Sequence, residues 1–165
     1  MTSDADDFHA FVVARSPALS RTAYLLTGDA HLAEDLVQTA LFKAARHWRR
    51  IQGSPEAYVR RILYTQNISW WRSRRHVREQ HLGAYDAAAP PTDPDLRLSL
   101  EQALARLTVR QRTVLVLRYF EDLTEVQTAA ALGISSGAVK SMSRQALKRL
   151  RDLSPELADL VGADA

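Results

Sequence analysis

Cysteine is absent from the 165 residues, and this absence excludes two kinds of site. Without thiols the chain can form neither a disulfide framework nor a cysteine-ligated zinc site. The five histidines are scattered, and none has the spacing to other histidines or carboxylates that metal motifs show. A glycine-rich phosphate loop is also missing. These absences argue against an enzyme and favour a protein that acts by binding.

Long apolar runs are absent as well. No apolar segment approaches the roughly 20 residues that cross a bilayer, so we expect no membrane insertion. The first residues include Asp4, Asp6 and Asp7 and lack the basic start of a signal peptide. We therefore expect a soluble, cytoplasmic protein.

Prolines are few, and three of the six lie in one short segment. Pro90, Pro91 and Pro94 fall within residues 83–95, which can neither continue a helix nor bury much apolar surface. On both sides of this segment apolar residues recur at helical spacing, and no stretch alternates as strands do. We predict an all-α protein of two small helical domains joined by a flexible linker, the C-terminal one a helix-turn-helix. The expected parts are a first domain at 1–80, a linker at 81–96, a second domain at 97–153 and a tail at 154–165.

Opposite charges are separated along the chain, although the net charge is only +3. Residues 36–78 carry ten Lys and Arg side chains against the single acid Glu56. Residues 102–153 carry nine basic side chains against four acidic ones, and the segments before, between and after these two are net acidic. Clustered basic residues are typical of nucleic-acid-binding surfaces, so each basic segment is a candidate for one.

The C-terminal basic segment contains the pattern of a helix-turn-helix. Thr124 and Gln127 have the spacing of a capping box, which starts a helix, and Gly133 can end that helix in a left-handed conformation. Ser135 is then a suitable N-cap for a second helix. Ala129 is small enough to let the two helices cross closely, as this motif requires.

The second of these helices, expected to run to about residue 150, has two contrasting faces. One is an apolar stripe that can pack on the rest of the domain. The other has basic and small side chains, which suit a helix that approaches base edges and phosphates of duplex DNA. An amphipathic hairpin with a merely solvated basic face would show the same pattern, and these residues alone leave that alternative open. The candidates for DNA contact are Ser136, Gly137, Lys140, Ser141, Arg144 and Lys148.

Helical patterns also fill the N-terminal half. We expect a first helix that Pro17 breaks or restarts, and a second helix over residues 30–48. The second helix has acidic and amide side chains on one face, among them Glu34, Asp35 and Gln38. Acidic side chains near the start of a helix stabilise it through their favourable interaction with the helix dipole. Taken alone, Glu34 and Asp35 are most simply interpreted in this way.

A third helix should begin at Ser54-Pro55-Glu56, where an N-cap, a proline at the first helical position and an acid coincide. It interleaves aromatic and arginine side chains, which suits single-stranded nucleic acid because bases stack on rings while cations follow the phosphates. For any single aromatic residue, burial in the core explains the pattern equally well. The high positive charge of the segment favours the nucleic-acid interpretation. The candidates here and in the preceding loop are Arg49, Arg50, Arg60, Arg61, Trp70, Trp71 and Arg74.

Several of these motifs, taken in order, resemble the RNA polymerase sigma factors of the extracytoplasmic-function (ECF) group. That group keeps only the second and fourth conserved regions of larger sigma factors. The likeness covers about residues 8–78 and 97–152. It is carried by the run Ala33-Glu34-Asp35-Leu36-Val37-Gln38, the segment 57–61, the Trp and Arg block at 70–75, and residues 107–112 followed by the helix-turn-helix.

The resemblance implies an activity and partners. An ECF sigma factor binds core RNA polymerase, directs it to specific promoters and helps to melt the minus-ten element. Glu34, Asp35, Leu36 and Gln38 would then dock on the β′ clamp, whose basic surface these groups complement. The C-terminal domain would contact the β flap and read the minus-thirty-five element. The resemblance also makes an anti-sigma factor a candidate partner, and it implies no cofactor.

The loop before the third helix and that helix itself match the part of the family that melts the minus-ten element and holds a flipped base. Extruding a base costs a few kcal/mol of stacking, which side chains must return. The sequence departs from the family pattern in the reading helix, where Met142 and Gln145 stand at common arginine positions. Thr108 stands where proline is usual, and its capping box with Gln111 explains that change.

A helix-turn-helix regulator with an N-terminal sensor or dimerisation domain is the alternative. It would explain residues 97–152 equally well, but it would not explain the basic aromatic segment or the acidic helix before it. Such a regulator would dimerise and bind promoter DNA without polymerase. A sigma factor would bind weakly alone and specifically as holoenzyme, so an assay with core polymerase separates the two.

Overall fold

Helices make up all regular structure in the described residues. The computed structural model describes residues 3–80 and 100–155, and no strand occurs within them, which confirms the predicted all-α fold. The linker expected at 81–96 and most of the tail lie outside the described residues. The N-terminal elements are α1 (Asp4–Thr27), α2 (Ala30–His47), the 3-10 helix η1 (Trp48–Arg50) and α3 (Pro55–Gln80). The C-terminal elements are α4 (Leu100–Ala105), α5 (Val109–Leu115), the π-helical turn η2 (Val116–Phe120), α6 (Glu125–Leu132) and α7 (Ser136–Leu153).

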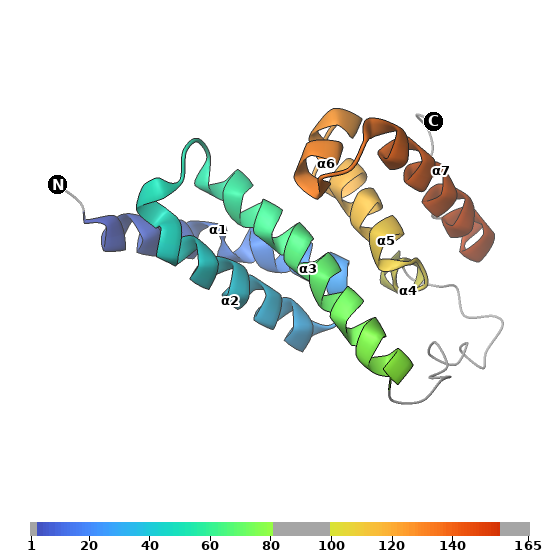
Figure 1. The fold of residues 1–165 in the computed structure, drawn as a ribbon, viewed down its shortest axis with the longest axis horizontal. Coiled ribbons are helices and arrows are strands. Elements are labelled where there is room, and N and C mark those ends of the chain that lie inside the picture. Colours follow the sequence, from blue (N-terminus) through green and yellow to red (C-terminus); the bar gives the residue numbers. More distant parts are fainter. Residues whose placement is uncertain (1–2, 81–99, 156–165) are drawn as a thin grey trace.

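The helices form two groups that lie side by side (Figure 1). The first group is α1–α3 and the second is α4–α7. Helix α3 packs against α5 and α6, and α1 also contacts α4, α5 and η2. The two groups therefore share an extensive interface.

Side-chain caps determine where several helices begin and end. Ser3, Thr108 and Thr124 each start a capping box, in which two N–H groups of the first turn gain side-chain acceptors. The boxes at Thr108 and Thr124 confirm the sequence predictions. Gly28 and Gly133 end α1 and α6 with φ of 69° and 67°, a left-handed conformation that glycine adopts without steric cost.

The first helix does not break at Pro17, so that expectation was wrong. Helix α1 is continuous, with Pro17 inside it. A proline deprives the carbonyl four residues earlier, here that of Val13, of its helical N–H donor. Val13 and Pro17 both lie on the solvent side of the helix, where water can satisfy this carbonyl. The hydroxyl of Ser16 also donates to the carbonyl of Val12 at 2.5 Å, a further local contact in this turn.

The largest hydrophobic core joins the two groups. It contains buried side chains of α1, α2 and α3 together with Val116 and Leu117 of η2, which are fully buried. Smaller clusters lie between α4, α5 and α7 and around the helix-turn-helix. Ala129 is buried with Val139 in the helix-turn-helix cluster, as the close crossing predicted from the sequence requires.

The π-helical turn η2 lies between these cores. The N–H of Glu121 donates to the carbonyl of Val116, five residues earlier, at 3.0 Å. Such a turn holds one residue more than an α-helical turn, which shifts the following side chains by about 100°. Leu115 packs with α4 and α7, whereas Val116 and Leu117 pack with α1–α3. One continuous stretch of chain therefore contributes to both groups.

Candidate nucleic-acid and protein interfaces

The basic face of α7 is exposed to solvent. Its opposite face is anchored by the buried side chains of Val139, Ala146, Leu147 and Leu150. Ser135 caps the helix by accepting a hydrogen bond from the N–H of Ala138 at 3.1 Å. The six predicted contact residues all lie on the exposed side: Ser136, Gly137, Lys140, Ser141, Arg144 and Lys148. None of the basic residues in this set forms an ion pair within the described chain, so their charges are available to phosphates.

Gly137 leaves space on this face. A Cβ added at this position would come no closer than 3.9 Å to Ser135 Oγ, an ordinary contact. The fold therefore does not require glycine here. The missing side chain instead lets another molecule approach the start of the helix closely, which a DNA-reading helix needs.

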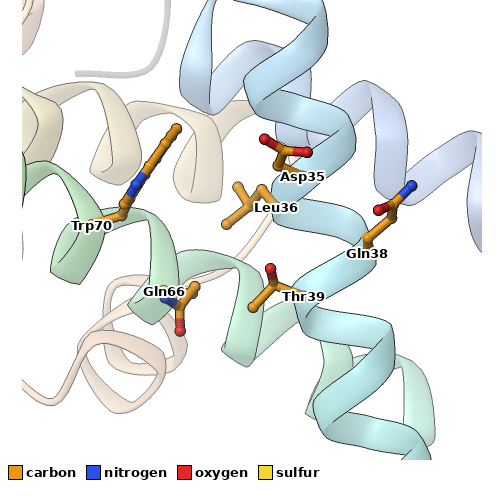
Figure 2. A pocket seen from close by; sticks show the side chains of 6 residues that line it. All are labelled: Asp35, Leu36, Gln38, Thr39, Gln66 and Trp70. Atoms are coloured by element: carbon orange, nitrogen blue, oxygen red, sulfur yellow. The ribbon is translucent and has the colours of Figure 1, made fainter.

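The acidic face of α2 borders a pocket of about 320 Å³ between α2 and α3. Glu34 and Gln38 are exposed and linked by a 3.4 Å hydrogen bond. Figure 2 shows Leu36 and Thr39 on the side of α2 that faces α3, with Gln38 pointing away from α3. Leu36 is 3% exposed, so it supports this surface from the core. The lining residues are Asp35, Leu36, Gln38, Thr39, Gln66 and Trp70.

A large apolar side chain on the same face was missed by the sequence analysis. Phe42 is 66% exposed, and it follows Asp35 and Gln38 by seven and four residues, which places all three on one stripe of α2. The periodicity of the helix could have found it, because position 42 lies outside the buried positions of α2. An exposed aromatic beside polar groups is typical of a protein-binding surface.

Arg60 lies in a polar network that joins the two groups of helices. Its guanidinium is paired with Glu56, at 3.0 Å, and with Glu121. Arg60 also donates to the hydroxyl of Thr22 at 3.1 Å, and that hydroxyl donates to Glu121 at 2.5 Å. The Tyr64 hydroxyl lies 3.4 Å from the same Glu121 carboxylate. Arg60 and Glu121 are only 18% and 12% exposed at their side chains, so this pair is largely shielded from solvent.

The network changes the acidity of two of its members. Burial alone would lower the pKa of Arg60, but the carboxylates of Glu121 and Glu56 outweigh burial and raise that pKa. Burial, followed by the charge of Glu121, raises the pKa of Tyr64 well above its ordinary value. Arg60 is therefore held as a cation and Tyr64 as a neutral hydroxyl.

Trp71 and Arg112 meet where α3 packs against α5. The guanidinium carbon of Arg112 lies 6.0 Å from the centre of the Trp71 ring, and the rings of Trp70 and Trp71 are 6.0 Å apart. Arg112 is 5% exposed, and burial lowers its pKa. Within residues 3–80 and 100–155, neither the Nε of Arg112 nor the indole N–H of Trp71 has a hydrogen-bond partner. This contact therefore buries polar groups without full compensation.

The residues predicted to contact the minus-ten element do not converge on one point. Arg49 and Arg50 are exposed in η1, and Arg49 is paired with Asp4. The two tryptophans lie about four turns along α3, roughly 20 Å from its start at 1.5 Å per residue. Arg61 is exposed between these ends, and the side chain of Arg74 lies outside the described residues. Trp70 lines the pocket beside α2, whereas Trp71 packs on Arg112 of α5, so the predicted residues lie on more than one side of α3.

The described residues contain neither a metal-binding cluster nor a membrane-spanning helix. No group of three or more histidine and acidic side chains there could hold a metal ion. None of the helices described is long and apolar enough to span a membrane.

The fold and these surfaces define a class: a helix-turn-helix protein with a second basic helical unit, as in transcription initiation factors. The family model for sigma-70 region 2 matches residues 11–77, and the model for sigma-70 region 4 matches residues 103–152. The chain belongs to the sigma-70 family, in the ECF group that contains these two regions only.

Named relatives agree with this assignment. The RNA polymerase sigma-E factor of Streptomyces coelicolor is 38% identical over 153 residues, which cover 88% of this chain and 85% of that protein. The ECF RNA polymerase sigma factor SigL of Mycobacterium tuberculosis (strain H37Rv) is 34% identical over 149 residues, 84% of each chain. The sigma factor RpoE of Bartonella quintana, solved in complex with the anti-sigma factor NepR, matches with a TM-score of 0.69 at 28% identity. That match covers 89% of this chain and 96% of that one, so it includes both groups of helices.

Proposed function

We propose that this protein binds core RNA polymerase in the cytoplasm, directs it to specific promoters and helps to melt the minus-ten element. The observation that carries the proposal is the presence of both sigma-70 regions, in order, each with an exposed basic surface. The role is one of binding, and it requires no catalytic group from this chain. A free-standing helix-turn-helix regulator is not favoured, because it leaves the region 2 match unexplained.

The α2 face is the proposed docking surface for polymerase, within a first domain at residues 1–80. Asp35, Glu34 and Gln38 offer acidic and amide groups to the basic coiled-coil clamp of β′. Phe42 adds an apolar anchor on the same stripe. Leu36 contributes indirectly, by fixing the backbone of this face from the core.

Helix α3 and the preceding η1 are the proposed surface for the opened minus-ten strand. Arg49, Arg50 and Arg61 are exposed and can meet phosphates, while Trp70 and Trp71 can stack on bases once accessible. Arg60 and Arg74 are further proposed contacts of this strand.

The exposed face of α7 is the proposed reading surface for the minus-thirty-five element, within a second domain at residues 97–153 that also meets the β flap. Gly137 and Ser141 allow close approach to base edges, and Lys140, Arg144 and Lys148 can contact phosphates or guanines. The candidate anti-sigma factor would act on these same domains.

The test is transcription by core RNA polymerase on a pool of random promoter sequences, with and without the protein. We expect run-off transcripts only with the protein, from templates that share two sequence elements. A regulator would instead shift duplex DNA without polymerase and start no transcripts. Absence of both holoenzyme and transcripts would refute the proposal.

A further inference from the structure

The pocket between α2 and α3 brings together side chains that the proposed function assigns to different partners. Asp35 and Gln38 belong to the proposed polymerase surface, whereas Trp70 is a candidate for the opened minus-ten strand. All three line the same cavity of about 320 Å³. Figure 2 shows the Asp35 carboxylate on the side of α2 toward α3, with Trp70 on the opposite wall, on α3. The pocket therefore combines a carboxylate with an indole ring.

The two neighbouring tryptophans have different surroundings. Trp71 packs on Arg112 where α3 meets α5, with the guanidinium carbon 6.0 Å from the ring centre. Trp70 is half-buried and follows Gln66 by four residues, so both belong to one face of α3, and both line the pocket beside α2. Trp70 is therefore placed to act together with residues of α2.

The pocket offers negative charge and hydrogen-bond acceptors. Asp35 is exposed and forms no ion pair with the residues that the structure describes. Thr39, one turn further along α2, adds a hydroxyl oxygen. The amide of Gln66 is held by Lys43, whose ammonium donates to its carbonyl oxygen at 2.5 Å. None of the six lining side chains is basic, so the pocket attracts a cation from another molecule.

A guanidinium fits these groups better than an ammonium. Its planar fork donates two parallel N–H bonds to one carboxylate, and its flat face stacks on an aromatic ring. Tryptophan is the aromatic side chain that attracts cations most strongly. An ammonium is a compact, strongly hydrated charge, which can meet the carboxylate but has no flat face for the ring. The pairing of Asp35 with Trp70 therefore favours arginine over lysine.

The size and position of the cavity indicate what enters it. Its volume lies near the lower end of small-molecule sites, which begin at about 300 Å³. Such a volume accommodates the end of one long side chain, whereas a helix or a nucleic-acid strand would remain outside. Asp35, Gln38 and Phe42 follow one stripe of α2, so a partner docked on this stripe passes beside the pocket. The occupant that fits is a side chain of that partner.

We propose that Asp35 and Trp70 form a socket for one arginine side chain of the polymerase clamp. The Asp35 carboxylate binds the edge of the guanidinium, and the Trp70 ring binds its face. This inference rests on the proposed function, because it names the group that the α2 surface receives from its partner. It moves Trp70 from the minus-ten surface to the docking surface and leaves the assignments of the other α3 residues unchanged.

Binding of the full chain to core RNA polymerase, without DNA, tests the role of the ring. Trp70→Leu and Trp70→Phe both remove the indole, but only the second keeps an aromatic face. We expect Trp70→Leu to weaken binding about tenfold, as for loss of a cation–ring contact, and Trp70→Phe less than about threefold. Helical circular dichroism should be the same in both variants, which separates a lost contact from a lost fold. Equal effects of the two substitutions on binding would overturn the inference.

A double-substitution cycle tests whether Asp35 and Trp70 hold the same group. Combining Asp35→Asn with Trp70→Leu should cost less than the product of the two single losses, because either change alone already releases the guanidinium. Phe42→Ala is the matched control, since Phe42 lies on the same stripe about 10 Å along the helix from Asp35. Its loss should multiply with that of Asp35→Asn. Multiplicative losses in both pairs would contradict a shared socket.

Substitutions on the polymerase identify the occupant. The arginines of the β′ clamp are changed to lysine one at a time, which keeps each charge. One of these changes should weaken binding of the unaltered chain about tenfold and have little further effect on Trp70→Leu. If no clamp arginine behaves in this way, the assignment is wrong. If Trp70→Leu spares polymerase binding but weakens binding of single-stranded minus-ten DNA by the holoenzyme, the ring contacts bases and the inference is overturned.

A measurement without polymerase separates this inference from the proposed function. Nuclear magnetic resonance follows the indole N–H signals of the three tryptophans, and Trp70→Phe identifies the signal of Trp70. Arginine amide should shift this signal at lower concentration than lysine amide, and Asp35→Asn should abolish the difference. Equal responses to the two cations would overturn the inference even if polymerase binds. A chain that prefers arginine amide but never joins polymerase would refute the proposed function and leave the guanidinium site standing.

Discussion

Single side chains on α2 carry the proposed polymerase contact, and they can be tested one at a time. Asp35→Arg should weaken binding to core polymerase at least about tenfold, because it brings a like charge to a basic surface. Asp35 is exposed, so helix content and thermal stability should not change. Asp7→Arg, an exposed acid on α1, is the control for total charge. Binding is measured by competition for core enzyme, and equal effects of both reversals would contradict the assignment.

Phe42 can be tested in the same assay. Phe42→Ala should cost about 1–2 kcal/mol of polymerase binding if the ring fills a pocket on the partner. The fold should tolerate the change, since the side chain is 66% exposed. Val13→Ala, on α1 and 64% exposed, removes apolar surface from a different place. Losses confined to Phe42→Ala support a specific contact, whereas equal losses would indicate a general effect of surface apolarity.

Tyr64 gives the polar network around Arg60 a pH signature. Its pKa in the folded protein lies above the unfolded value of about 10, so the folded state favours the protonated hydroxyl. The resulting stability is fully present below about pH 10 and is lost as the pH rises toward the higher, folded value. Tyrosinate absorbance should show one of the five tyrosines ionising late, and Tyr64→Phe should remove that component. Simultaneous ionisation of all five in folded protein would contradict this.

At the scale of elements, the prediction for duplex DNA concerns the exposed face of α7. Lys140→Ala or Arg144→Ala should each weaken promoter duplex binding by about 1–3 kcal/mol if a base contact is lost. If the contact is to phosphate, binding should fall uniformly across sequences, with a salt slope lower by about one. Arg149→Ala is the control, since it removes an exposed charge from the same helix outside the basic face. Fluorescence anisotropy at several salt concentrations distinguishes these cases.

The starts and ends of the helices were largely predictable because they depend on local chemistry. The boxes at Thr108 and Thr124 and the end at Gly133 each follow from a few neighbouring residues. The effect of Pro17 was not predictable, because the cost of a proline inside a helix depends on whether the freed carbonyl faces water, which the sequence does not state. The buried position of Leu36 was available from the helical spacing of its neighbours. Leu36 was instead assigned to the docking surface because it belongs to the family's docking motif.

The contacts between the groups were not predictable. Arg60 and Glu121 are 61 residues apart, and no local pattern marks them as partners. The π-helical turn likewise has no sequence signature comparable to a capping box. The two basic segments were recognised from their charge. The second group of helices packs on part of the first basic segment, and this packing depends on the tertiary fold, which local sequence patterns do not show.

At the scale of the whole molecule, Leu117 should stabilise helices to which it is not adjacent in sequence. Leu117→Ala should lower the free energy of unfolding by about 2–5 kcal/mol, and its effect on amide hydrogen exchange should be strongest in α1–α3. Val139→Ala, in the separate cluster of the helix-turn-helix, should act mainly on α6 and α7. If exchange in α1–α3 is unaffected by Leu117→Ala, the shared core does not persist in solution.

The π-helical turn at Val116–Phe120 also makes the fold sensitive to the insertion or deletion of a residue within it. Removing one residue there would restore an ordinary helix and rotate all that follows by about 100°. The carboxylate of Glu121 would then point away from α3, and the reading helix would face a different direction. Natural variants of this protein should therefore conserve the length of this turn.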